Sequence, residues 1–538
     1  MASNYFQNVK RGLDNVSFEL TGVNTNIANA LRRCILSEVP VYGFEDEPKR
    51  VFSTWRHNGI PIPRGIHITE NTSSLHNEFI SHRIGLIPIY CARPIVSEFN
   101  REICDRVFKP STDESRIREL EGRLMGLSAD SDERTVIEDM LQDERELPEF
   151  KLDITNDTST RKALKNGDYY KTLGRERRVD ISSNNIVRVT SDMFHTKSGD
   201  ELNYIKYDPK IFEEFKDDKG KGLEEYAVIV TLKPGIDGEG QALKAVVRPN
   251  PGIARYHSKY CPVGTVSYSF KRIEDAKAIR ATFEKSLRQT NRMRTMKGLE
   301  PFDTDVFGVG DEMTSENPEV IKLWNNFQII ERDRLYETED DGSPKYYMFN
   351  VESIGSLEPA QIVHDALYML RLKLIDIFEH AGEDGFDYIT FTRSSGVMPG
   401  IDITINNENH TMGNIITGAL NENPAIDFAG YKMPHPLRER IVFRITLRSD
   451  DNKVEDAIAI FKDSVYKTIL TITELIQDWS KKNSDLYVRL VDTTTETFLN
   501  DMKKTQTKTD TDSTSTKSTK STKTRRKVRV KKIKKTKK

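Results

Sequence analysis

Residues 401–447 have the sequence IDITINNENHTMGNIITGALNENPAIDFAGYKMPHPLRERIVFRITL, and the pattern of this stretch indicates the fold of its domain. Alternating apolar residues predict strands at both ends of this stretch, and the apolar spacing of residues 410–420 predicts a helix between them. A further strand is expected at residues 388–393, and a long helix follows the last strand. The resulting order, β-β-α-β-β-α, predicts an α+β fold in which an antiparallel sheet packs on helices.

The long final helix has more apolar surface than its own domain can cover. Its apolar stripe runs for about seven turns, and a domain of roughly 100 residues has too small a core for that length. A second helix, at residues 362–380, also has an unusually wide apolar arc. We therefore expect the two helices to cover each other, and the residues predicted at this contact are Leu367, Leu370, Leu374, Phe461, Val465, Ile469 and Ile472.

Two amphipathic helices are expected near the beginning of the chain. Residues 24–40 have apolar residues at helical spacing, and Arg32 and Arg33 stand side by side in the middle. Taken alone, two such arginines favour a solvated polar face. A second helix is expected within residues 75–84, where Phe79 contributes to the predicted apolar face.

The formal charge of the chain is strongly segregated. The whole chain carries −2, but residues 502–538 hold 16 Lys or Arg and 2 Asp, a net +14 that leaves −16 for residues 1–501. This basic segment cannot bury enough apolar surface to fold, so we expect a disordered tail. It could hold nucleic acid or an acidic partner, act as a nuclear address, or remain solvated. The residues expected at such a contact are Arg525, Arg526, Lys527, Arg529, Lys531 and Lys532.

The sequence gives little support to an enzyme, a metal site or a membrane protein. His76, Glu78 and His82 have the spacing H-x-E-x-x-x-H, whereas the zinc-protease pattern needs two histidines at i and i+4. No phosphate loop, nucleophile–base set or carboxylate cluster occurs at usable spacing. No apolar run approaches the ~18 residues of a membrane span, and the start lacks the apolar core of a secretory signal. An intracellular, noncatalytic chain without membrane partners is expected.

Several motifs occur in order along the chain: NIANALRRCILSEVP at 26–40, NTSSLHNEFISHRIGLIPI at 71–89 and YYMFNVESIGSLEPAQIV at 346–363. They resemble the third-largest subunit of eukaryotic RNA polymerase II, the archaeal D subunit and, more distantly, the bacterial alpha amino-terminal domain. The stretch from 405 to 437, INNENHTMGNIITGALNENPAIDFAGYKMPHPL, is similar to the eleventh subunit, or archaeal L. The chain thus resembles a head-to-tail fusion of two subunits that are usually separate.

The resemblance implies two alpha-type dimerisation domains in a pseudo-twofold pair, with a mixed inserted domain. A short linker would make their pairing intramolecular, although exchange between two chains stays an alternative. The expected parts are a third-subunit-like domain at residues 1–91 and 226–380, an insertion at 92–225, a linker at 381–387, an eleventh-subunit-like domain at 388–490 and the tail at 502–538.

The resemblance also implies a function. In the family, the pair is a noncatalytic platform on which the second-largest and largest subunits of a DNA-directed RNA polymerase assemble, and nucleotidyl transfer resides in those large subunits. Small polymerase subunits are further expected partners, and template DNA would be met only through the complex. The alternative is a nucleic-acid-binding protein that acts through the tail. The residues matching the family's large-subunit interface are Asn29, Arg32, Arg33, Glu78, His82 and Arg83.

One departure from the family concerns metal. Many third-subunit homologues hold zinc or an iron–sulfur cluster with four cysteines, but here Cys91 and Cys104 stand alone in the corresponding region, so no cofactor is expected. Fused pairs of this type are typical of large DNA viruses. The resemblance therefore implies a viral source, with the virion and the host cytoplasm as locations and the host nucleus as an alternative suggested by the tail.

Overall fold

The computed structural model describes residues 4–44, 55–89, 150–196, 226–307, 314–382, 388–448 and 453–486, with short gaps inside several of these ranges. Contacts between residues far apart in sequence join these ranges up to residue 487 into one compact unit. Over the described ranges, no helix combines the length and the apolar content that a membrane span requires.

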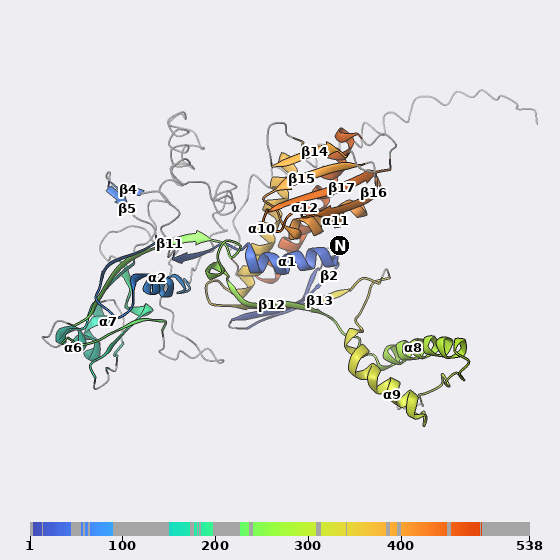
Figure 1. Cartoon of the computed structure of the whole chain (residues 1–538), viewed down its shortest axis with the longest axis horizontal. Coiled ribbons are helices and arrows are strands. Elements are labelled where there is room, and N and C mark those ends of the chain that lie inside the picture. The colour runs from blue at the N-terminus through green and yellow to red at the C-terminus, as the bar shows by residue number, and fades with distance from the viewer. Residues whose placement is uncertain are drawn as a thin grey trace, which may run out of the picture. The chain divides into compact units, whose positions relative to one another are not determined.

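Two four-stranded antiparallel sheets enclose a layer of helices (Figure 1). The first sheet has the order β1-β2-β13-β12, with strands Phe6–Arg11, Asn15–Thr21, Tyr346–Ser353 and Val263–Phe270. The second has the order β14-β15-β17-β16, with strands Ile389–Arg393, Ile401–Asn406, Arg440–Leu447 and Ile426–Lys432. We call residues up to 382 the first half and residues from 388 the second half. The predicted α+β fold is confirmed, and the second half has the expected β-β-α-β-β-α order.

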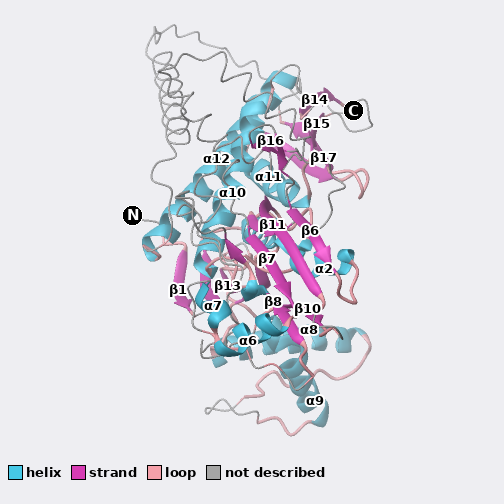
Figure 2. Cartoon of the chain, turned by 90° about the vertical axis from the view of Figure 1, so that its left-hand side faces the viewer, coloured by secondary structure: helices cyan, strands magenta, loops and turns pink. Residues whose placement is uncertain are grey.

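The helix layer consists of two pairs, each with one member from each half. The long pair is α10 (Pro359–His380) and α12 (Val454–Lys482), and the short pair is α1 (Thr25–Ser37) and α11 (His410–Glu422). The long helices pack against each other, and so do the short ones. α10 and α1 also contact the first sheet, and α11 and α12 contact the second. Figure 2 shows α10, α11 and α12 side by side.

α10 is buried on nearly every side because it lies against α1, α12 and the first sheet at once. Helices that are apolar all round are core helices, whereas a surface helix needs only one apolar stripe. α12 is amphipathic and buries its stripe from Ala457 to Trp479. Its exposed side carries residues such as Gln477.

A separate sheet within the first half crosses the expected boundaries of the insertion. Its order is β3-β11-β7-β9, and β6 also pairs with β11; the strands are Val41–Phe44, Ala242–Gly252, Phe150–Thr155, His195–Thr196 and Gly65–Asn71. β7 belongs to the predicted insertion at 92–225, yet it pairs with β11 along residues 150–155. The 11-residue strand β11 therefore joins strands from inside and outside the predicted insertion in one sheet.

The hairpin from β12 to β13 carries a helical module, which we define as residues 271–337. It contains α8 (Ala276–Met296), α9 (Pro318–Asn326) and the helical turns after α9. The module has a hydrophobic cluster of its own. The two ends of the module are joined to each other by the backbone hydrogen bonds from Ile273 to Leu335 and from Glu337 to Lys271, and Lys271 also donates to the carbonyl of Tyr346 in β13.

The packing of α10 on α12 can be tested by creating a cavity. Ile469 is fully buried on α12, so Ile469→Ala should lower the free energy of unfolding by about 2–5 kcal/mol. The measurement is urea unfolding of the whole chain followed by circular dichroism. Gln477→Ala, on the exposed side of the same helix, is the control. Equal urea midpoints for Ile469→Ala and Gln477→Ala would contradict the buried position of Ile469 on α12.

Candidate assembly site

The two short helices meet through side chains and caps. The side chain of Asn24 caps α1 by accepting a hydrogen bond from the backbone of Ile27, at 3.0 Å. The side chain of Asn409 caps α11 by accepting a 2.8 Å hydrogen bond from the backbone of Thr411. Thr411 accepts a 2.7 Å hydrogen bond from Nε of Arg33, across the two halves. Arg33, which is predicted at the large-subunit interface, therefore also contacts the second half.

Glycine lets these helices approach closely. A Cβ atom built on Gly418 of α11 would lie 2.5 Å from Nδ2 of Asn26 on α1, well inside van der Waals contact. Next to this position, Asn24 donates a 3.1 Å hydrogen bond to Glu422. A larger residue at 418 would therefore require the side chain of Asn26 to move.

A group of charged side chains forms a bridge between the halves; we call it the interhalf charge cluster. Its first-half members are Glu38, Arg255 and Lys373, and its second-half members are Glu408 and Glu439. Nζ of Lys373 lies 3.3 Å from Glu38 and 3.5 Å from Glu408. Arg255 makes a two-pronged contact with Glu439, at 2.6 and 3.1 Å, and lies 3.8 Å from Glu38.

Most of this cluster is shielded from water. Glu38, Lys373 and Glu408 are 4%, 8% and 3% exposed. Burial alone would lower the pKa of Lys373, but the nearby carboxylates of Glu38 and Glu408 outweigh it and raise that pKa. Burial raises the pKa of Glu408 and exceeds the opposing effect of Lys373 and Arg255. Since an isolated buried charge is costly, each member depends on its partners remaining in place.

The long helices form the apolar part of the junction. All seven residues predicted at the contact between α10 and α12 are at most 1% exposed: Leu367, Leu370, Leu374, Phe461, Val465, Ile469 and Ile472. Nε1 of Trp479 on α12 donates a 3.0 Å hydrogen bond to the carbonyl of Ala360 on α10. This bond satisfies the only polar atom of the largest buried side chain, so it fixes how the two helices align.

The first strand is attached to the end of α12. Asp478 accepts a 2.9 Å hydrogen bond from the backbone of Phe6, and Lys482 pairs with Asp478 and donates to the carbonyl of Phe6. The ring of Phe6 packs edge-on against Trp479, with centroids 4.8 Å apart. The beginning of the first half is thereby held by the last helix of the second.

Arg32 is held by a residue of its own helix, α1. Its Nε and Nη2 both donate to Oδ1 of Asn29, at 3.1 and 3.0 Å, which holds the guanidinium in one orientation. Both side chains are partly exposed. Within the described ranges, no carboxylate pairs with Arg32. Its remaining N–H groups can therefore donate to an external carboxylate or carbonyl.

α2 (Asn77–Gly85) presents the second predicted segment on a different element, against β3, β6 and β10 (Val228–Leu232). Glu78 and His82 are exposed, and Nη1 of Arg83 donates a 2.8 Å hydrogen bond to the carbonyl of Ile229. Phe79 is 58% exposed, so its expected place on the buried face is wrong; Ile80 and Ile84 fill that face instead. Phe79 and Leu86, which is 66% exposed, leave an apolar patch on the outer side of α2.

The remaining site predictions concern metal, cysteine and the tail. No group of three or more potential metal ligands occurs among the residues that the structure describes. Cys34 is buried, and burial raises the pKa of its thiol; Cys261 is partly exposed, and both are free thiols. Cys91, Cys104, the rest of the predicted linker after 382, and the tail residues Arg525, Arg526, Lys527, Arg529, Lys531 and Lys532 lie outside the described residues.

The interhalf charge cluster was not predicted from the sequence. One signal was present: Lys373 interrupts the apolar helix around Leu374, and Glu408 directly precedes the cap of α11. Its members come from five separate segments, so only the folded chain identifies them as partners.

Comparison with known proteins agrees with this geometry. The family model described as the RNA polymerase Rpb3/Rpb11 dimerisation domain matches residues 17–374, and a second model of the same description matches residues 400–477. The boundary between the two matches falls between the two halves of the structure.

Similar proteins carry polymerase names for both halves. The subunit 3 of DNA-directed RNA polymerases II, IV and V from Arabidopsis thaliana is 25% identical over 367 residues, which cover 67% of this chain and 86% of that protein. The RNA polymerase II subunit rpb11 from Dictyostelium discoideum is 38% identical over 72 residues, 13% of this chain and 60% of that protein. The subunit Rpo3 from Thermococcus kodakarensis is 32% identical over 84 residues, 16% of this chain and 25% of that protein.

The interhalf charge cluster predicts a large effect of removing its central cation. Lys373→Met leaves two buried carboxylates without their shared partner, so the free energy of unfolding should fall by about 3–5 kcal/mol. Lys467→Met, which removes an exposed cation paired with Asp463 on α12, should change it by less than about 1 kcal/mol. Urea unfolding of both variants measures the difference.

A second substitution separates charge from packing. Adding Glu408→Gln to Lys373→Met removes one of the orphaned charges and should restore part of the stability. If Lys373→Met were as stable as Lys467→Met, the cluster would contribute no stability to the junction.

Proposed function

Because the chain belongs to the RNA polymerase Rpb3/Rpb11 dimerisation domain family and carries that domain in each half, we propose that it is a noncatalytic assembly subunit of a multisubunit DNA-directed RNA polymerase. One chain would supply the platform that two separate subunits form elsewhere. Nucleotidyl transfer would then reside in the large subunits that this platform recruits.

The packing of α10 against α12 is the observation that carries the proposal. Each helix has an apolar surface too wide for its own sheet, and each covers the other's excess. The junction has the polar contacts of a fitted interface as well: Arg33 to Thr411, Trp479 to Ala360 and the interhalf charge cluster. We infer that the halves pair within one chain as an intramolecular version of the third/eleventh-subunit heterodimer. Exchange of halves between two chains is the alternative.

Two surfaces are proposed for the second-largest and largest subunits. The first is Arg32 with Asn29 on α1, where a held guanidinium has free donors. The second is the outer side of α2, where Phe79 and Leu86 expose apolar surface beside Glu78 and His82. Exposed aromatic residues and arginines are typical of protein interfaces, whereas isolated solvated faces are rich in Lys and Glu. Arg33 and Arg83 remain part of the proposed interface, and their hydrogen bonds to Thr411 and to the carbonyl of Ile229 orient them.

The other partners of the chain, its source and its location in the cell stay predictions. We propose small polymerase subunits as additional partners and contact with template DNA only through the complex. The viral source, the locations in the virion, host cytoplasm or host nucleus, and the absence of a cofactor likewise remain predictions. Nucleic-acid binding through the tail is the alternative function, and no described residue bears on it.

The proposal is tested by co-expressing the chain with the two large subunits and isolating it by affinity. Arg32→Glu reverses the charge of the held guanidinium and should reduce recovery of the large subunits by about tenfold or more, as expected for a buried interface arginine. Phe79→Asp should act in the same direction. Lys162→Glu, on the exposed side of α6 (Thr158–Asn166), is the control with an equal charge change.

Circular dichroism of each variant separates loss of docking from loss of fold. Unchanged recovery with Arg32→Glu and with Phe79→Asp would contradict the two surfaces. Failure of the wild-type chain to recover any large subunit would contradict the platform function itself.

A further inference from the structure

The helical module is built as a unit that can present a surface of its own. Its cluster includes Phe283, Leu287 and Val306, and Trp324 packs edge-on against Phe283 at 4.9 Å. The buried Asn291 fixes the loop after α8, since it donates to the carbonyl of Phe302 and accepts from its backbone N–H, both at 2.7 Å. α8 is therefore held firmly along one side.

The opposite side of α8 is a stripe of cations. Lys277, Lys285, Arg288 and Arg292 are exposed and fall within an arc of about 80° over about 22 Å of helix. We call these four residues the α8 cation stripe. Arg288 makes a 3.5 Å contact with Glu284, and among the described residues the other three cations form no ion pair. By contrast, Arg294 on the inner side pairs with Glu319 at 2.9 Å and stacks over Phe302.

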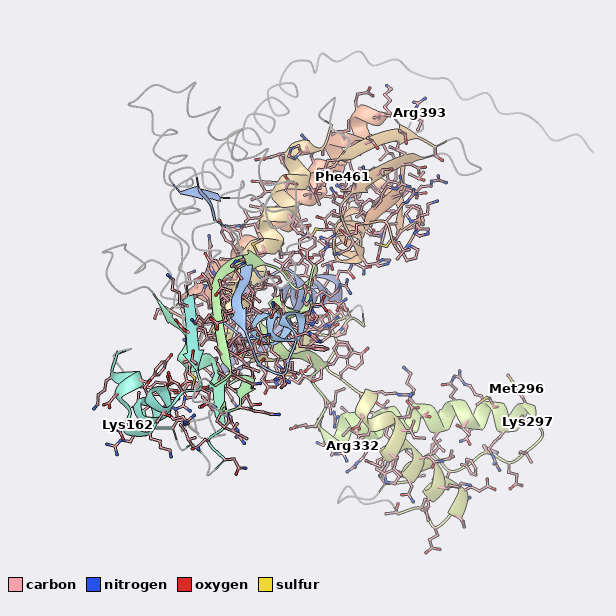
Figure 3. All side chains as sticks on the ribbon, turned by 60° about the vertical axis from the view of Figure 1, so that its left-hand side comes forward. Lys162, Met296, Lys297, Arg332, Arg393 and Phe461 are labelled. Carbon is pink, nitrogen blue, oxygen red and sulfur yellow. The ribbon has the colours of Figure 1, made fainter. Side chains whose placement is uncertain are left out.

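The cation stripe leads into an apolar tip. Met293, Met296 and Leu299 are 56%, 87% and 50% exposed at the carboxyl end of α8. Figure 3 shows Met296 and Lys297 at the end of the module far from Arg332. Methionine adapts its shape to different apolar partners and is favoured on surfaces that bind amphipathic segments.

We propose that the α8 cation stripe and its methionine tip form a docking surface for an acidic amphipathic segment of a partner protein. The exposed cations of the stripe are complementary to carboxylates, and the methionine tip is complementary to an apolar residue at one end of the same segment. A nucleic acid fits less well, because phosphates gain nothing from exposed methionines and no aromatic side chain accompanies the stripe for base stacking. This surface is separate from those proposed for the large subunits and would give an assembled polymerase a site for an accessory factor.

Methionine oxidation gives a local readout that the basic tail cannot mimic. The full chain is treated with dilute hydrogen peroxide, and sulfoxide formation at Met293 and Met296 is followed by mass spectrometry, with Met433 of the second half as reference. The probe is a synthetic 20-residue helical peptide with Glu on one face and Leu on the other. At a peptide concentration several times its Kd, the probe should slow the oxidation of Met293 and Met296 by about fivefold or more and leave the oxidation rate of Met433 unchanged.

Two matched double variants test whether the protection from oxidation depends on the α8 cation stripe. Lys285→Glu with Arg292→Glu should abolish it, whereas Lys162→Glu with Lys165→Glu, an equal charge change on exposed positions of α6, should preserve it. A peptide with Ser in place of Leu should protect much less. Protection by a 20-base-pair DNA duplex but not by the peptide would overturn the proposal in favour of a nucleic-acid surface. Protection by neither probe would show a solvated face and would also overturn it.

Discussion

The pairing of α10 with α12 is the constraint on which the rest of the structure depends. Neither helix can be covered by its own sheet, so the apolar surface of each half is incomplete without the other. Burying this surface also removes Lys373, Glu38 and Glu408 from water, which requires them to meet in a fixed geometry. The apolar contact supplies the driving force, and the charges make it specific, because a shifted register would leave them unpaired.

A rigid junction explains how one chain can present surfaces on several elements. Arg33 ties α1 to α11, and Phe6 ties the first strand to the end of α12, so the four helices and both sheets hold one arrangement. Arg32 then projects from this junction, whereas α2 packs on β3, β6 and β10. The helical module departs from this plan, since it carries its own core and extends from the β12–β13 hairpin.

Helices, strands and their apolar faces could be predicted from the spacing of residues in the sequence. Contacts between segments far apart in the sequence could not. The stripes of α10 and α12 and the β-β-α-β-β-α order follow from local spacing, and the resemblance to a fused Rpb3/Rpb11-like chain is confirmed by the family matches. Arg33 lies about 100° around the helix from Arg32, and only the position of α11 decides that it turns inward. β11 lies outside the predicted insertion, as expected, but its pairing with β7 inside the insertion could not be predicted, because a strand's partners depend on segments distant in sequence.

The most direct test of the junction is to cut the chain between its halves. A protease site replaces the linker after residue 382, and the cleaved protein is passed over a size-exclusion column with light-scattering detection at nanomolar to micromolar concentration. Both fragments should elute together with the 61.7 kDa mass of one chain, apart from the inserted site, because α10 and α12 hold them without a covalent link. Separate elution of the fragments, or a mass of two chains before cleavage, would contradict the account.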